Sequence, residues 1–423
     1  MKWLMDFLLV RGVNHFVPHA FGDQFPDSDC PPHFYANGQN PQFSGFTQLM
    51  HYVNRAAHLL SGADMEASGA ILYHAEAAWM DADAMLMQKP AKVCYDAHIS
   101  YDIVPMDYLK SAETRDGKFG RGYRYLIVPA CKQLSPCFTE IAARLRRAGV
   151  PIFFINEAPA GVNACPEELV PLAQIASRIL AQHLAHDYQT SARLLRIAKF
   201  TRDELTVFFL FNESLQTVQT TLQLPVCGQY IAADFLNEQY VRDEAAQGEV
   251  TVELAAGQSV LLVFGGVSQE EWLAFPAKQD KLHTQILDVQ WDIDLRETGR
   301  EENFRPLRRK SKLFNITGLE DEREFSGEIR YRTTINLEKA ERMVLNIEHV
   351  GMTACLFANG RDLGQRICAP YCWDIADAVR NGENEIEVLA ANTLVQRMQD
   401  RLSSYMAIPA SGLTGNVTLS VTQ

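Results

Sequence analysis

The sequence of 423 residues lacks the patterns by which cysteine usually binds metal. None of its nine cysteines forms a Cys-x-x-Cys pair, and no paired histidine spacing completes a zinc site. The number of cysteines is odd and their positions are scattered, which favours free core thiols in a reducing compartment. We therefore expect no metal site, and a cytoplasmic location.

Basic residues are also in deficit, with 39 Lys and Arg against 52 Asp and Glu, a net charge of −13. This balance works against binding to phosphate backbones and anionic lipid surfaces. No apolar run reaches the length of a membrane span. The opening Met1–Val10 is interrupted by Asp6 and closed by Arg11, too early for a signal peptide. Neither nucleic acid nor a membrane is an expected partner.

Glycine is missing at the positions where two kinds of site would need it. Tyr73–Ala77 follows a predicted strand but has no glycine to let the backbone approach a pyrophosphate, so we expect no cofactor. Cys131 lies between a predicted strand and a predicted helix, where an amidotransferase nucleophile would lie. The strained turn of such a nucleophile needs flanking glycines, which are absent. The sequence therefore favours an ordinary thiol at Cys131.

The composition is that of a well-cored globular protein, with 47% apolar and 22% charged residues, and the length suits two to four domains. At the start, a helical run over Lys2–Val10 leads through Gly12 to Val13–Phe21, predicted to be a short buried strand. A polar and aromatic loop, Gly22–Gln42, and an amphipathic helix ending near Gly62 follow. Alternating helix and strand is the unit of a (β/α)8 barrel, and one unit cannot close it. Residues 1–67 are thus predicted to be the C-terminal part of such a barrel.

Strand and helix alternate over residues 68–184, which predicts a flavodoxin-like α/β domain with a parallel sheet. The predicted strands lie at Ala70–Tyr73, Ile103–Pro105, Tyr125–Val128 and Val150–Ile155. Ser135 is the predicted N-cap of one helix, and a second helix is predicted over Leu169–Leu180.

Only strands are predicted beyond this domain. Short strands at short intervals over residues 185–266 predict a small antiparallel β-sandwich, and those over 279–423 predict a jelly roll with a hairpin turn at Asn359-Gly360. One basic run in this last domain is interpreted as a solvated loop that pairs with acidic neighbours; it contains Arg305, Arg308, Arg309, Lys310 and Lys312.

Three stretches carry a resemblance to the C-terminal portion of bacterial multidomain glycoside hydrolases: Arg11–His19 with Asp29–Tyr35, Ile71–Trp79, and Ala358–Gly364 with Pro370-Tyr371, Asp374-Ile375, Asn381–Asn384 and Asn392-Thr393. They are similar to family 2-type and family 106, α-L-rhamnosidase-like, enzymes. The order of barrel and flavodoxin-like domain is also similar to family 42 β-galactosidases. The last stretch resembles the galactose-binding-like, sugar-binding jelly roll of family 2 enzymes. The resemblance implies hydrolysis of O-glycosyl bonds, with a carbohydrate as substrate.

The chain departs from these families at the catalytic centre. Glycosidases use two carboxyl groups about 5–10 Å apart across the scissile bond. In barrel enzymes of this type those groups lie on strands before the last one, and this chain does not contain those strands. We therefore assign no catalytic residue and expect the isolated chain to be inactive. The missing barrel portion, or a second copy of the chain, is the expected protein partner.

Two groups of residues are candidates for contact with carbohydrate. The barrel segment and its loop contribute Asn14, His19, Asp29, His33 and Tyr35, in which polar groups and a ring suit sugar hydroxyls and C–H faces. The start of the α/β domain contributes His74, Glu76 and Trp79, at the carboxyl end of a strand where open α/β sheets bind ligands. Structural roles are the alternative for each residue, and for the second group this would be a contact with the barrel rim.

A further set in the jelly roll is interpreted as core or domain interface, with a sugar site as the alternative; it consists of Arg330, Tyr371, Trp373, Asp374 and Asn392. For the chain as a whole, the alternative to a glycosidase part is a non-catalytic carbohydrate-binding or scaffold subunit that completes a split glycosidase.

Overall fold

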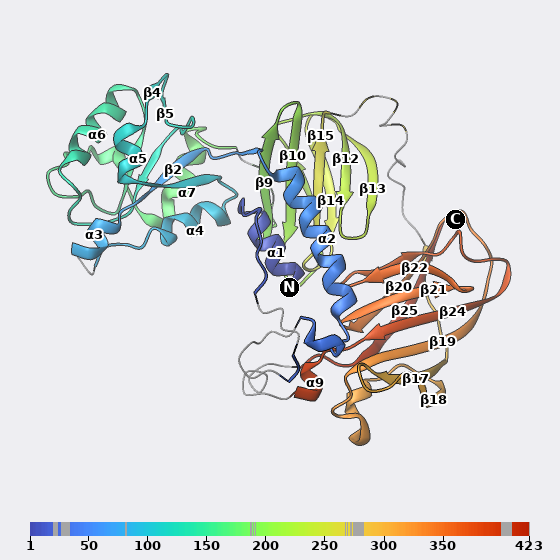
Figure 1. Cartoon of the computed structure of the whole chain (residues 1–423). Helices are drawn as coiled ribbons and strands as arrows, with labels where there is room; N and C mark the ends of the chain where they lie inside the picture. Colours follow the sequence, from blue (N-terminus) through green and yellow to red (C-terminus); the bar gives the residue numbers. More distant parts are fainter. Residues whose placement is uncertain are drawn as a thin grey trace.

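The structure is a computed structural model that describes residues 1–19, 24–26, 34–80, 83–186, 188, 190, 192–266, 268, 270, 273, 283–398 and 408–422. It is mixed and rich in sheet. Three sheet-containing units lie in a row, with the α/β unit at one end, an antiparallel unit covered by two helices in the centre, and the C-terminal unit at the other end (Figure 1).

The α/β unit is built on a five-stranded parallel sheet in the order β3-β2-β6-β7-β8. Its strands are β2 (Gly69–Tyr73), β3 (Tyr101–Pro105), β6 (Leu126–Val128), β7 (Ile152–Ile155) and β8 (Leu169–Val170). Apolar residues of α5 (Met106–Ser111) and α6 (Cys137–Arg147) pack on one face. Those of α4 (Gln88–Asp96) and α7 (Ile175–Ala181) pack on the other, so both faces are buried. Smaller elements are α3 (Ala75–Met80), β4 (Thr114–Arg115), β5 (Lys118–Phe119), η2 (Pro166–Glu168) and η3 (Leu172–Gln174).

Two local predictions in this unit are wrong. Leu169 and Val170 lie in β8 and not in a helix. Pro171 explains the difference, because the residue before a proline disfavours helical backbone angles. Ser135 does not cap α6, which begins at Cys137 without a side-chain cap.

The central unit pairs a six-stranded sheet, β1-β9-β10-β15-β12-β13, with a two-stranded sheet, β11-β14. Its strands are β1 (Asp64–Met65), β9 (Leu195–Arg202), β10 (Leu205–Asn212), β11 (Val218–Gln223), β12 (Gly228–Asp234), β13 (Gln239–Ala245), β14 (Glu249–Leu254) and β15 (Ser259–Phe264). Helices α1 (Lys2–Leu9) and α2 (Phe43–Leu60) cover the face of the larger sheet that carries Phe209 and Phe211. Phe208 and Leu210 face the smaller sheet, so β10 is apolar throughout because both of its faces are covered.

The predicted strand over Val13–Phe21 is wrong across its described part. Residues 13–19 form no strand, and Val13 and Val17 are 40% and 80% exposed. A strand is stabilised by hydrogen bonds to a neighbouring strand, and no described strand pairs with this segment. The predicted helices on either side are confirmed as α1 and α2. The rest of the following loop that the structure describes contains η1 (Ala36–Gly38).

The C-terminal unit packs a six-stranded sheet, β18-β17-β19-β24-β21-β22, against a four-stranded one, β16-β25-β20-β23. Trp291, Tyr331 and Trp373 are buried in the core between them. Its strands are β16 (His283–Ile286), β17 (Trp291–Glu297), β18 (Arg305–Ser311), β19 (Gly327–Leu337), β20 (Met343–Gly351), β21 (Thr353–Ala358), β22 (Arg361–Arg366), β23 (Tyr371–Asp374), β24 (Gly382–Ala391) and β25 (Gly412–Val421). Short helices are η4 (Ile316–Gly318), η5 (Glu320–Glu322) and α9 (Val395–Met398).

The Asn359-Gly360 turn is confirmed between β21 and β22, with φ of +51° and +78°. The basic run is a strand, β18, and not a loop. Its predicted pairing with acids is confirmed for Arg305 with Glu322 and for Arg309 with Asp294.

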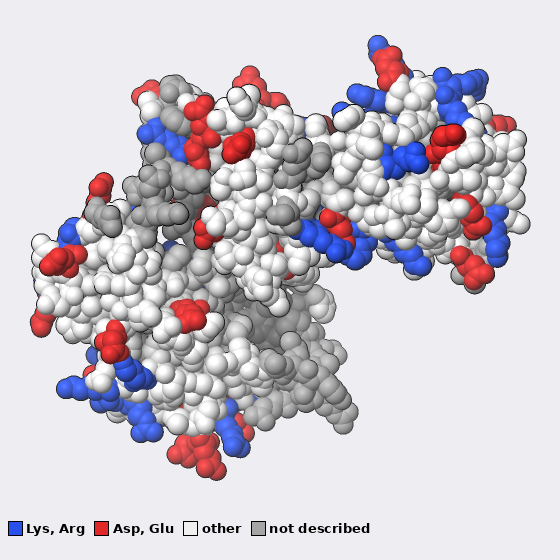
Figure 2. Space-filling model, turned by 180° about the vertical axis from the view of Figure 1, so that it is seen from behind, with Lys and Arg blue, Asp and Glu red and all other residues white. Residues whose placement is uncertain are grey.

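Basic and acidic side chains lie among one another over the described residues of all three units on the face that Figure 2 shows. None of the helices in the part of the chain that the structure describes combines the length and apolar character that crossing a bilayer requires.

Candidate functional site

Two residues of the first predicted group, Asn14 and His19, lie in the segment that follows α1. Asn14 is half-buried and His19 is exposed. Neither side chain has a hydrogen-bond partner among the described residues. Asp29 and His33 lie outside the described residues.

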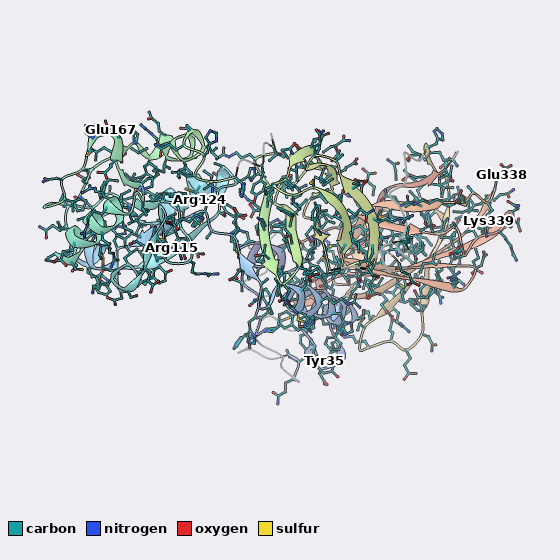
Figure 3. All side chains as sticks on the ribbon, turned by 90° about the horizontal axis from the view of Figure 1, so that it is seen from above. Tyr35, Arg115, Arg124, Glu167, Glu338 and Lys339 are labelled. Atoms are coloured by element: carbon teal, nitrogen blue, oxygen red, sulfur yellow. The ribbon has the colours of Figure 1, made fainter. Side chains whose placement is uncertain are left out.

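Tyr35 stands at the start of η1 and is half-buried. Its ring packs edge-on against Phe43 of α2, with ring centroids 5.0 Å apart. Figure 3 shows Tyr35 at one edge of the molecule, away from Arg115 and Arg124 of the α/β unit.

The second predicted group follows β2 at the carboxyl edge of the parallel sheet. His74 is buried, and burial lowers its pKa although backbone carbonyls of Leu72 and Met85 oppose this effect. Glu76 is exposed and Trp79 is 82% exposed on the short helix α3. The group thus combines a buried imidazole with an exposed indole and an exposed carboxyl group.

The structure does not bring the two groups together. Helix α3 lies at the outer end of the α/β unit, whereas the segment after α1 lies beside the central unit (Figure 1). The contact of His74, Glu76 and Trp79 with a barrel rim, and the role of either group in binding sugar, remain predictions.

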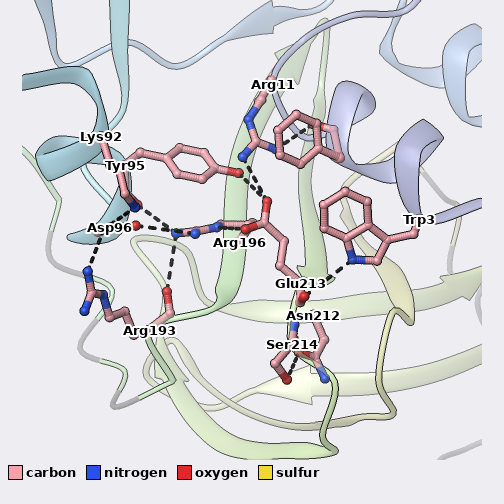
Figure 4. Close-up of polar contacts among 11 residues, drawn as sticks. Trp3, Arg11, Lys92, Tyr95, Asp96, Arg193, Arg196, Asn212, Glu213 and Ser214 are labelled. Carbon is pink, nitrogen blue, oxygen red and sulfur yellow. Dashed lines mark hydrogen bonds and ion pairs between the residues drawn. The ribbon is translucent and has the colours of Figure 1, made fainter. Parts of the chain in front are cut away.

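The residues that sequence reasoning missed form a joint between the α/β unit and the central unit (Figure 4). Glu213, which follows β10, accepts hydrogen bonds from Arg196 Nε at 2.7 Å, Arg11 Nη2 at 2.9 Å and the Tyr95 hydroxyl at 3.0 Å. The Arg11 guanidinium lies over the ring of Phe7 at 3.3 Å and that of Tyr95 at 4.1 Å. One carboxylate therefore holds α1, α4 and the central sheet in place.

A second carboxylate, Asp96 at the end of α4, completes this joint. It accepts hydrogen bonds from Lys92 at 2.8 Å and Arg193 at 2.7 Å, and lies 3.5 Å from Arg196 Nη2. Burial tends to raise the pKa of Asp96, but the hydrogen bonds from Lys92 and Arg193 outweigh it and bring the pKa to about 2. The two carboxylates of the joint thus lie among four basic side chains, Arg11, Lys92, Arg193 and Arg196.

One signal in the sequence could have found part of this joint. Arg196 occupies an inward position of a strand that otherwise buries apolar side chains, between Leu195 and Ala198. Such an arginine needs a counter-ion. In the β9–β10 hairpin Arg196 lies opposite Phe211. Glu213 follows two residues later and is therefore within reach of the Arg196 guanidinium.

Among the described residues, no exposed carboxyl group has the raised pKa that a general acid needs. Only Asp6 has a raised pKa there, because burial outweighs its pairing with Lys2, whose Nζ lies 2.6 Å away. Asp6 is fully buried and also accepts a hydrogen bond from the Tyr52 hydroxyl, which in turn contacts Ser259 Oγ at 3.1 Å. This cluster fastens α1 and α2 to β15.

The described residues contain no group of three or more His, Cys, Asp or Glu side chains that could hold a metal ion. All eight described cysteines are free, Cys131 is buried, and Cys30 lies outside the described residues.

The set in the C-terminal unit is mostly core. Trp373 and Tyr371 are buried in the hydrophobic core, and Asn392 donates to Phe325 O at 2.7 Å inside the unit. Arg330 neutralises Asp294 at 2.9 Å, together with Arg309 and Arg332. The structure therefore favours the structural interpretation of these residues.

No protein-family model matches this sequence, and no curated protein sequence matches it. Among solved structures, a rhamnosidase from Novosphingobium sp. PP1Y is similar with a TM-score of 0.71 and 16% identity, over 99% of this chain and 45% of that one. A β-galactosidase from Bacillus circulans sp. alkalophilus matches 55% of this chain and 46% of its own, with a TM-score of 0.38 and 11% identity. A β-glucuronidase from an uncultured Clostridium sp. matches 35% and 30%, with a TM-score of 0.26 and 20% identity.

This chain spans less than half the length of the rhamnosidase that it matches. The resemblance to rhamnosidases that the sequence indicated is confirmed at the level of the fold: over nearly its whole length, the chain folds like part of a rhamnosidase chain.

Proposed function

We propose that this chain is the C-terminal, accessory part of a glycoside hydrolase, which acts on O-glycosyl bonds in carbohydrate catabolism and has its catalytic carboxylates outside this chain. The observation that carries the proposal is the fold likeness to the rhamnosidase over 99% of this chain. In this proposal residues 1–67 are the end of a (β/α)8 barrel, 68–184 a flavodoxin-like domain, 185–266 a small sandwich and 279–423 a jelly roll.

The one raised pKa among the described carboxyl groups does not mark a catalytic acid. A general acid of a glycosidase has a raised pKa beside its substrate. Among the described residues the one carboxyl group with a raised pKa, Asp6, is enclosed and paired with Lys2. Asn14, His19, Tyr35 and Trp79 are the side chains that we propose for contact with sugar.

A chromogenic assay tests this proposal. We expect no release of p-nitrophenol from p-nitrophenyl α-L-rhamnoside by the purified chain. Turnover that the substitution Glu76→Gln abolishes would contradict the proposal, because it would place a catalytic carboxylate in this chain.

A second candidate is a non-catalytic subunit that completes a split glycosidase in the cytoplasm. Exposed apolar side chains on and after α1 favour it, since such a surface suits a protein partner; they are Trp3, Leu4, Val13 and Val17, between 40% and 80% exposed. The genomic sequence immediately upstream distinguishes the two candidates. Barrel strands encoded in frame support one polypeptide, and barrel strands in a separate gene support a split enzyme.

A further inference from the structure

A cleft of about 510 Å³ lies where three parts of the chain meet: α2, the turn between β12 and β13, and strand β22. Figure 1 shows α2 running from the central unit to the C-terminal unit past β13 and β22. The contact is close, because a Cβ on Gly45 of α2 would lie 3.1 Å from Ile367. The lining includes Gln48, His51, Arg55, Phe235, Asn237 and Arg366.

Arg366 is the unusual residue of this cleft. It is only 8% exposed, yet no carboxylate among the described residues forms an ion pair with it. Its Nε donates to Cys372 O at 3.0 Å and its Nη1 to Gln365 O at 3.2 Å, whereas its Nη2 has no hydrogen-bond partner among the described residues. The Trp373 ring lies 5.5 Å from the guanidinium, and the Asp234 carboxylate, which forms no ion pair with it, also acts on its charge from a greater distance. Burial lowers the pKa of Arg366, although the charges of Cys372, Asp234 and Cys355 oppose this effect.

The acids around the cleft are already engaged. Asp234 accepts hydrogen bonds from the backbone of Leu236 at 3.1 Å and from Asn237 Nδ2 at 2.8 Å. Glu238 pairs with Arg55 at the rim, at 2.6 Å. A buried guanidinium left unpaired disfavours folding, and an anion from outside the chain would remove that cost.

Two of the residues that line the cleft, Gln48 and Asn237, have a buried amide oxygen without a donor among the described residues. Gln48 Nε2 donates to Leu236 O at 3.3 Å and to Gln365 O at 3.1 Å, which fixes the amide and leaves Oε1 buried without a partner. The bond from Asn237 Nδ2 to Asp234 fixes the second amide, and its Oδ1 is also buried without a partner. Acceptors of this kind require a donor such as a hydroxyl group.

We propose that this cleft binds a hydroxylated organic anion, a sugar acid or a sugar phosphate, with its anionic group on Arg366 and its hydroxyl groups on Gln48 and Asn237. Guanidinium pairs well with carboxylate and phosphate, so Arg366 accepts either anion. The proposal does not depend on the function proposed above, because the cleft lies wholly within this chain.

Isothermal titration of the full chain with four probes tests the proposal: D-glucuronate, D-glucose 6-phosphate, D-glucose and inorganic phosphate. We expect binding of glucuronate or glucose 6-phosphate, and the tighter of the two identifies the anionic group. Glucose should bind at least tenfold more weakly, because it cannot neutralise Arg366. Failure of both anions to bind would overturn the proposal, and so would equal affinity for glucose 6-phosphate and inorganic phosphate, which would leave the amide oxygens without a role.

Substitution locates the site. Arg366→Met should weaken binding of the tighter anion by about tenfold or more, the usual worth of hydrogen bonds to a charged group. Arg361→Met, on the exposed start of the same strand, is the matched control and should leave the affinity unchanged. Arg366→Lys keeps the charge but not the fork of donors, and should also weaken binding. Unchanged affinity in Arg366→Lys would overturn the proposal even if Arg366→Met failed to fold.

Discussion

Two buried arginines in this chain have opposite surroundings. Arg196, in the joint between the α/β and central units, is 4% exposed and has Glu213 at 2.7 Å and Asp96 at 3.5 Å. Arg366, in the cleft beside the C-terminal unit, is 8% exposed, donates hydrogen bonds only to backbone carbonyl groups among the described residues, and lies over the Trp373 ring. The first charge is neutralised within the chain, and the second is not.

This difference separates structural charge from charge available for binding. A buried ion pair with all of its hydrogen bonds made holds elements in place, and breaking it is costly because the partner remains buried. A buried charge without an ion pair disfavours the folded state, and an anion from outside the chain can supply the missing pair. The joint at Glu213 is therefore expected to be sensitive to substitution, and the cleft at Arg366 tolerant.

The largest expected effect is that of Glu213→Gln, which leaves Arg11 and Arg196 without their shared carboxylate. We expect the free energy of unfolding to fall by about 3–5 kcal/mol, the range for breaking a buried ion pair. Urea denaturation followed by tryptophan fluorescence measures it, and Trp3 reports on the joint because it contacts Glu213. Glu238→Gln is the control, since its exposed pair with Arg55 should be worth at most about 1 kcal/mol. Equal losses in both variants would contradict the comparison.

A smaller effect is expected for Tyr95→Phe. The substitution removes the hydroxyl that donates to Glu213 but keeps the ring between Arg11 and Arg196. The free energy of unfolding should fall by about 1–2 kcal/mol, the worth of one hydrogen bond to a charged group. Tyr73→Phe, at an exposed ring, should change it little. A loss in Tyr95→Phe as large as that in Glu213→Gln would mean that the hydroxyl, not the carboxylate charge, maintains the joint.

Acid should weaken the joint through Asp96. Its folded pKa of about 2 lies below the ordinary value of 3.8, so its stabilising contribution is complete above about pH 4 and is lost as the pH falls toward 2. Because solvent screens part of the pair, we expect Asp96→Asn to remove only about 1 kcal/mol of this acid dependence. Urea unfolding between pH 2 and 5 measures the slope, with Asp107→Asn in an exposed pair as control. Parallel slopes for wild type and Asp96→Asn would contradict the assignment.

Much of the fold could be predicted because its signals are local. Helical spacing predicted α1 and α2, and short apolar runs predicted most strands of the three units. The strand over Val13–Phe21 failed because a strand needs a partner, and no local pattern shows whether one is present. The basic run failed for the opposite reason, since its charges resemble a loop while pairing with Asp294 and Glu322 holds it in a sheet.

The joint and the cleft could not be predicted in the same way. Arg11, Tyr95 and Glu213 come from three separate parts of the sequence, and no spacing in the sequence brings them together. Arg366 is one charged residue in a strand. That it forms no ion pair among the described residues becomes visible only in the fold, where α2 and the β12–β13 turn lie beside it. Sequence reasoning therefore recognised the kind of protein better than its charged centres.

The most direct test compares Arg366→Met with Arg196→Met by urea unfolding under the same conditions without ligand. Removing the uncompensated charge of Arg366 should leave the free energy of unfolding unchanged or slightly higher, whereas Arg196→Met should lower it by about 3 kcal/mol. A loss in Arg366→Met as large as that in Arg196→Met would contradict the account, because it would show that Arg366 is part of the structural framework.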